Sequence, residues 1–107
     1  MSEQSTVSGR QIAAGRVLAG VSLAELAAAA RVPPALLKRM EAAGAAFPEP
    51  AKERDSVRRA LENFGVIFLP EGGGDGAGVR LKFTRRDVKQ IGRLEGEGGT
   101  VRDDDVP

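Results

Sequence analysis

Apolar residues recur at helical spacing along the first two-fifths of this 107-residue chain. Residues 8–19 carry Ile12, Ala13 and Leu18 on one expected inward face, which predicts a first helix. Two short apolar stripes follow, separated by a turn of only a few residues. The first stripe consists of Leu26, Ala27, Ala30 and Val32, and the second of Leu36, Leu37 and Met40. The pattern predicts two further helices packed closely together.

Local signals mark the ends of these helices. Ser22 is a suitable N-cap for the second helix, and Glu25 three residues later completes a capping box. Proline is favoured at a first helical position, so the third helix is expected at Pro34–Ala43, with Gly44 as its C-terminal stop. The two prolines of the following AAFPEPAK stretch predict a loop.

The second half of the chain changes from helical to alternating periodicity. A fourth helix is expected at about Glu53 to Asn63, with a stripe that contains Val57, Ala60, Leu61 and Phe64. Gly65 ends it, residues 66–69 (VIFL) read as a strand, and GGGDGAG reads as a loose turn. Residues 79–83 return as a strand of alternating apolar and basic side chains. The unbroken apolar run of the first strand suggests that it is covered on both faces.

A two-stranded hairpin at residues 65–83 is marginally stable alone and needs a partner. Pairing with the same hairpin of a second subunit would cover its edge and its surplus apolar side chains, and we expect such a homodimer. The alternative is a hairpin folded back on its own domain as a small wing. The candidate dimerisation residues are Val66, Ile67, Phe68, Leu69, Val79, Leu81 and Phe83.

Residues 84–95 open with a capping-box pattern, Thr84 to Asp87, and continue with Val88, Ile91 and Leu94, which predicts a short helix. Six basic residues and one acidic residue in 79–94 make this region basic, whereas Asp103, Asp104 and Asp105 make the end acidic. We expect residues 1–7 and 96–107 to be disordered.

The composition excludes several classes of chemistry. The chain has no Cys, His, Tyr or Trp, so disulfides, Cys or His metal sites and imidazole or thiolate catalysis are absent. GGGDGAG lacks the Lys-Ser/Thr of a phosphate loop and lies between two strands. We therefore expect no enzyme, no catalytic or metal-binding residue and no cofactor. No secretory signal and no membrane-length apolar run is visible, which favours a cytoplasmic, nucleoid-associated protein.

The two close-packed helices between Ser22 and Glu41, the second left free to enter a DNA groove, are typical of a helix-turn-helix. From GRQIAAGRVLAGVS through ARVPPALLKRME the chain resembles the lambda-repressor/Cro-type (XRE) family, over about the first third to two-fifths of its length. The matches are Arg16, Gly20, Ser22, Glu25-Leu26-Ala27, Val32, Leu37 and Arg39-Met40-Glu41. The resemblance implies a mainly α fold, a lambda-repressor-like bundle of about four helices over residues 8–64, followed here by the β-hairpin and the short basic helix.

The resemblance further implies a transcriptional regulator that binds double-stranded DNA, as a homodimer on an inverted repeat. It implies that Arg16 and Glu41 form a salt bridge that braces the first helix against the third. The candidate DNA-binding residues on this basis are Ser22, Arg31, Pro33, Pro34, Ala35, Lys38 and Arg39.

The chain departs from the family at several of these positions. Leu23 stands where a phosphate-binding Gln is frequent, and Arg31 where the turn often has Gly. Pro33, Pro34 and Ala35 replace side chains that hydrogen-bond base edges, which leaves Pro34 and Ala35 for apolar contact with thymine methyl groups. We expect Lys38 to meet a phosphate and Arg39 a guanine or a phosphate.

An alternative function stays open. The same fold can serve as a protein-interaction module, such as an antitoxin-like or anti-regulator subunit, with the hairpin or the C-terminal helix binding a different chain. Similarly, the acidic tail either competes with DNA for the basic surface or, as we prefer, is a solvated end.

Overall fold

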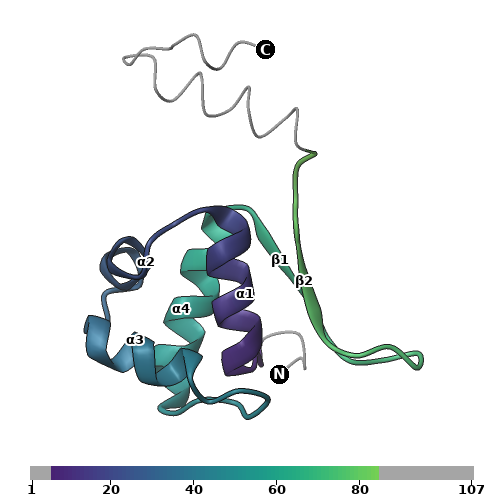
Figure 1. Ribbon diagram of the computed structural model, residues 1–107, viewed down its shortest axis with the longest axis horizontal. Helices are drawn as coiled ribbons and strands as arrows, with labels where there is room; N and C mark the ends of the chain where they lie inside the picture. Colours follow the sequence, from purple (N-terminus) through teal and green to yellow (C-terminus); the bar gives the residue numbers. More distant parts are fainter. Residues whose placement is uncertain (1–5, 85–107) are drawn as a thin grey trace, which may run out of the picture.

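The computed structural model describes residues 6–84. Except for its first residue, the helix expected at 84–95 lies outside the described residues, as does the acidic tail. The described chain is mostly helical, with one antiparallel hairpin at its end (Figure 1). The elements are α1 Gly9–Ala19, α2 Leu23–Ala30, α3 Pro34–Glu41, α4 Ala51–Asn63, β1 Val66–Leu69 and β2 Gly78–Leu81. In Figure 1, α2 and α3 lie on one side, α1 and α4 in the middle, and the hairpin on the opposite side.

Several element boundaries differ from those expected. Helix α3 ends at Glu41 instead of Ala43, and Gly44 adopts φ 68° in the turn that follows. Helix α4 begins two residues early, because Pro50 serves as its N-cap residue and leaves the next residue free to be helical. Strand β2 covers Gly78–Leu81, so Phe83 lies beyond the paired segment.

The core lies among the four helices and the inner face of the hairpin. Its largest fully buried side chains are Val7, Ile12, Leu26, Leu37, Met40, Val57, Leu61 and Val66. Burial of each of these contributes about 1.5–3 kcal/mol relative to exposure. Val7 was expected in a disordered N-terminus and is instead fully buried, so the ordered domain begins before the first helix.

The expected inward positions of Leu18 and Phe64 are wrong, since these side chains are 43% and 40% exposed. Helix α1 contacts α3, α4 and the hairpin through a face that contains Gly9, Ile12 and Gly15. Leu18 falls on the remaining arc of the helix. The 3.6-residue spacing of apolar residues predicted this helix correctly. Part of its buried face was predicted wrongly, because glycines occupy the positions of closest contact and carry no apolar side chain.

The hairpin packs against its own domain, as in the small-wing alternative. Val66 pairs with Leu81 and Phe68 with Val79, and these four side chains share the face toward the helices. A Cβ on Gly15 would lie 3.2 Å from Val66 Cγ1, so the glycine lets β1 approach α1 closely. Ile67 is half-buried and Leu69 is 38% exposed, so within its own chain β1 is fully covered on one face only.

The turn of the hairpin is tighter than the loose loop expected. Gly72 and Asp75 form an isolated antiparallel bridge, with backbone N–H to O distances of 3.0 and 2.9 Å. Gly73 and Gly74 between them have φ of 60° and 89°, which suits a two-residue hairpin turn with positive φ at both central residues.

No single helix among residues 6–84 is long and apolar enough to cross a membrane. Helices α1 and α2 together have the length and apolar composition of a membrane span, but they are bent by 110° relative to each other.

Candidate nucleic-acid interface

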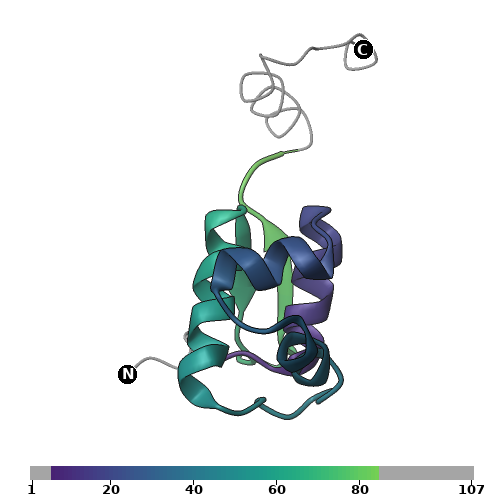
Figure 2. The ribbon, with the colours of Figure 1, turned by 90° about the vertical axis from the view of Figure 1, so that its left-hand side faces the viewer.

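Helix α2 begins with the capping box that the sequence predicts. Ser22 Oγ accepts a hydrogen bond from the Glu25 N–H at 3.0 Å, and Glu25 Oε1 accepts one from the Ser22 N–H at 2.7 Å. In Figure 2, α2 runs across the face toward the viewer, and α3 lies below it and is seen nearly end-on. Since the chain enters α3 at its left-hand end in Figure 1, the first turn of α3 projects from this same face.

The turn between the two helices is closed by Arg31. This residue has φ 61°, the one positive φ among the described residues other than glycine. The left-handed conformation costs a non-glycine residue roughly 1–2 kcal/mol. The exposed Arg31 lines a shallow hollow with Ser56, Arg59 and Asn63 of α4. The structure thus places Arg31 beside a second arginine, at the end of α2 farthest from Ser22.

Helix α3 presents two different faces. Leu37 and Met40 are buried in the core, whereas Lys38 and Arg39 are exposed. Its first turn is also exposed, from the N-cap residue Pro33 through Pro34 to Ala35. All the DNA-contact positions inferred from the resemblance are therefore accessible to a ligand.

Arg16 and Glu41 form a two-pronged ion pair between α1 and the end of α3. Arg16 Nε donates to Glu41 Oε2 at 2.6 Å and Nη2 donates to Oε1 at 3.1 Å. Arg16 Nη1 also donates to the Val21 carbonyl at 3.3 Å, in the segment before α2. The hydrogen bond with Glu41 raises the pKa of Arg16. The pair inferred from the resemblance is therefore present, and Arg16 links α1 to the end of α3 and to the segment before α2.

The N-termini of α1, α2 and α3 differ in the partners of their backbone N–H groups. At α1, the Gly9 N–H donates to the Ala46 carbonyl at 3.0 Å and the Arg10 N–H to the Gly44 carbonyl at 2.8 Å. At α2, the N–H groups of Leu23 and Ala24 have no partner among the described residues, and the same holds for Ala35 in α3. Helix N-termini with free N–H groups attract anions.

Gln11 is an organising residue that the sequence analysis missed. Its side-chain oxygen accepts from the Ser8 N–H at 2.9 Å, while Ser8 Oγ accepts from the Gln11 N–H at 3.0 Å. Its Nε2 donates to the carbonyls of Leu69 and Gly78, at 3.2 and 3.1 Å, where the hairpin strands reach the turn. The spacing Ser8-x-x-Gln11 was a usable signal for the cap, but the bonds to the hairpin depend on packing alone.

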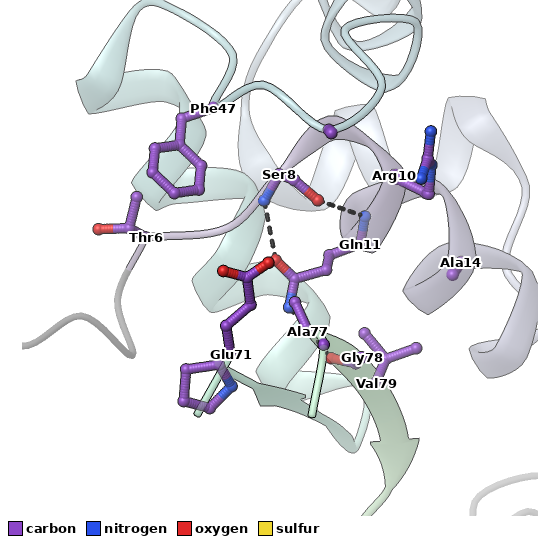
Figure 3. Close-up of a pocket in the computed structure, with 13 residues that line it drawn as sticks. Thr6, Ser8, Arg10, Gln11, Ala14, Phe47, Glu71, Ala77, Gly78 and Val79 are labelled. Atoms are coloured by element: carbon purple, nitrogen blue, oxygen red, sulfur yellow. Dashed lines mark hydrogen bonds between the residues drawn. The ribbon is translucent and has the colours of Figure 1, made fainter. Parts of the chain in front are cut away.

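An open hollow of about 810 Å³ lies between the start of α1, the loop that contains Phe47, and the hairpin turn (Figure 3). Ser8 and Gln11 in its wall already bond to each other, and Glu71 and Phe47 are exposed at its rim. Within residues 6–84 no group of three His, Cys, Asp or Glu side chains is placed to hold a metal ion. The hollow offers no pair of groups suited to acid–base or nucleophilic chemistry.

Comparison of the chain with protein-family models, with curated proteins and with solved structures gave no match.

Proposed function

We propose that this chain is a transcriptional regulator that binds double-stranded DNA with α3 in the major groove. One observation carries the proposal. The exposed first turn of α3, the open N-terminus of α2 and the exposed Lys38 and Arg39 belong to two adjoining helices, while the opposite faces of these helices are buried. A helix held in this way beside a second helix is the arrangement that a helix-turn-helix uses to enter a groove.

The backbone of the DNA would be held by the start of α2 and by the basic residues of α3. The free N–H groups of Leu23 and Ala24 suit a phosphate, in place of the Gln side chain that Leu23 replaces. Ser22 Oγ already accepts a bond from Glu25, so the Ser22 hydroxyl contributes to phosphate binding only as a donor. Lys38 and Arg39 add two exposed positive charges one turn further along α3.

We further propose that the regulator acts as a homodimer on an inverted repeat, with a revised pairing surface. Val66 and Phe68 are only 2% and 7% exposed and pack in the core of their own chain. Pairing through the hairpin would therefore use its outer face, where Leu69 and Ile67 lie, or the residues at the free edge of β2. At that edge the Arg80 guanidinium donates to the Leu81 carbonyl at 3.2 Å, a bond that edge pairing would have to replace.

A protein-interaction module is the second candidate. The observation that favours it is the exposure of Val17, at 68%, beside the partly exposed Leu18 on α1. Two neighbouring aliphatic side chains add to the apolar surface that a different protein could cover. In this case the hairpin or the region after it would bind another chain, and DNA binding would be weak or unspecific.

Selection of binders from a pool of random duplex DNA, with the full chain at near-physiological salt, tests these proposals. Enrichment of an inverted repeat supports a dimeric, sequence-reading regulator, and its half-site spacing reports the dimer geometry. Bound DNA without a common sequence points to electrostatic binding. Recovery of no DNA, even at lower salt, contradicts the DNA-binding proposal and favours the protein-interaction module.

Two matched variants locate the binding surface. Lys38→Ala and Arg39→Ala each weaken DNA binding about 5- to 10-fold and leave the melting temperature unchanged, as expected for loss of an exposed cationic contact. Lys82→Ala removes a cation from the hairpin, on the opposite side of the molecule in Figure 1, and leaves affinity near wild type. Equal losses in all three variants would mean that only net charge matters.

The homodimer is tested by sedimentation of the full chain. Leu69→Glu places a charge on the outer face of the hairpin without entering the core, so it separates a hairpin-paired dimer into monomers that keep their fold. A monomeric wild type contradicts the dimer directly. Phe68→Glu is not a useful probe, because Phe68 is buried and its substitution unfolds the domain.

A further inference from the structure

The tip of α3 is unusually poor in hydrogen-bonding groups. Pro33 and Pro34 have no backbone N–H, and neither they nor Ala35 has a polar side-chain atom. The N–H groups of Leu36 and Leu37 both donate to the Pro33 carbonyl, at 3.0 and 3.1 Å. The Ala35 N–H is thus the one free donor of this turn among the described residues. What the tip presents to a ligand is mainly two proline rings and a methyl group.

The major groove offers such a surface few favourable partners. Its floor consists of base-edge donors and acceptors and of the 5-methyl groups of thymine. An apolar group pressed against a donor or acceptor removes its water and returns no hydrogen bond, which is unfavourable. Against a 5-methyl group the same contact removes apolar surface from water on both sides and is favourable. The tip is therefore selective for positions with a methyl group.

We propose that Pro33, Pro34 and Ala35 recognise a 5-methylpyrimidine in the major groove. This inference rests on the proposed DNA-binding function. Thymine and 5-methylcytosine present the same methyl group, so either base supplies the chemistry that the tip requires. Lys38 and Arg39, a turn away, supply charge, and their contribution does not depend on this methyl group.

The test measures the affinity of the full chain for a duplex recovered by the selection above. Each thymine of the half-site is replaced in turn by uracil, which removes the methyl group and keeps the base pair. Affinity falls about fourfold for each methyl group in contact, since burial of one such group contributes roughly 0.8 kcal/mol. Unchanged affinity at every position overturns the inference while leaving the DNA-binding proposal intact. Absence of binding to every duplex overturns both.

A second arm distinguishes the two bases. At each uracil-sensitive position the T·A pair is replaced by C·G and, separately, by 5-methylcytosine·G. If the methyl group is what is read, 5-methylcytosine restores about fourfold of the affinity lost with cytosine. Tighter binding of the methylated duplex than of the thymine duplex identifies methylated DNA as the preferred ligand. No difference between cytosine and its methylated form overturns the inference.

Protein variants assign the effect to the tip. Pro34→Ala removes the ring and keeps a helix-compatible residue, so the thymine-to-uracil affinity ratio falls toward one. Lys38→Ala is the matched control, because it weakens binding to both duplexes and leaves their ratio unchanged. A ratio that survives in both Pro34→Ala and Ala35→Gly contradicts the assignment of the methyl contact to this turn.

Discussion

Helices α1 and α2 begin with the same local device and use it differently. Each has a serine N-cap and a capping box with the residue three positions on, Gln11 in α1 and Glu25 in α2. At α1 the cap is buried, and backbone carbonyls from the loop after α3 take up the Gly9 and Arg10 N–H groups. At α2 the cap is exposed and the corresponding N–H groups are free.

The comparison shows that an N-cap determines where a helix begins. It does not determine whether the N–H groups of the first turn find partners in the fold. A closed N-terminus joins parts of the fold, and an open N-terminus is left for an anion. One free end belongs to α2, which adjoins α3, where the proposed function needs it. The Ala51 and Lys52 N–H groups at the start of α4 also have no partner among the described residues. Four pairs of substitutions test this distinction, from the largest expected effect to the smallest.

Gly9→Ala adds a methyl group at the closed N-terminus of α1. A Cβ at this position would clash with the Met40 carbonyl and lie 3.0 Å from the Ala43 Cβ, so α1 and the end of α3 must separate. We expect a loss of about 3 kcal/mol in the free energy of unfolding, the upper part of the range for overpacking. Denaturant unfolding measures it. Leu23→Ala at the corresponding position of α2 is the control and should cost much less.

Gln11→Ala compares the third residue of the two capping boxes. It removes the bond to the Ser8 N–H and the two side-chain bonds to the hairpin carbonyls, which costs about 2 kcal/mol. Glu25→Ala, its exposed counterpart, costs only about 0.5–1 kcal/mol. Equal losses in thermal unfolding would mean that Gln11 does not hold the hairpin.

Arg16→Ala tests whether α3 and its proposed DNA-binding surface depend on the ion pair that joins α3 to α1. Loss of a charged hydrogen-bonded partner lowers stability by about 1.5 kcal/mol and also weakens DNA binding, because α3 loses its brace. Glu41→Ala should behave in the same way. Calorimetry and DNA titration check both effects, and an unchanged melting temperature contradicts the brace.

Ser8→Ala and Ser22→Ala compare the N-caps of α1 and α2 directly. Each removes an N-cap hydroxyl and lowers stability by about 1 kcal/mol or less. Only Ser22→Ala should also lower DNA affinity, by a few-fold, since only this cap lies at the proposed phosphate-binding end. Loss of affinity in Ser8→Ala alone would reverse the assignment of open and closed ends.

Much of the helical fold could be predicted, because its signals are local. The apolar stripes of α2 and α4, the Ser22 capping box, Pro34 at the start of α3 and the alternation in β2 each depend on a few neighbouring residues. The inward face of α1 was assigned less well. Gly9 and Gly15 lie at its closest contacts because they have no side chain. A pattern of apolar side chains cannot identify such positions.

The hairpin shows the same limit. Its strands and their alternation follow from the residues, but whether the apolar surplus meets the same chain or a second copy is a question of tertiary packing. The structure turns Val66 and Phe68 into the chain's own core and leaves Leu69 exposed. Gln11 holds the turn end of the hairpin against α1. A side chain that bonds to a carbonyl 67 positions away leaves no local pattern.

The sequence by itself determined the helices, their caps, the hairpin and the absence of imidazole and thiol chemistry, since these follow from composition and from neighbouring residues. The Arg16–Glu41 pair came from a resemblance, and the structure gives it its geometry. Only the tertiary structure decided which helix ends are closed and which are open, and which face of β1 is buried. The physical reason is that solvent exposure and the partners of backbone groups are set by chain segments far apart in the sequence.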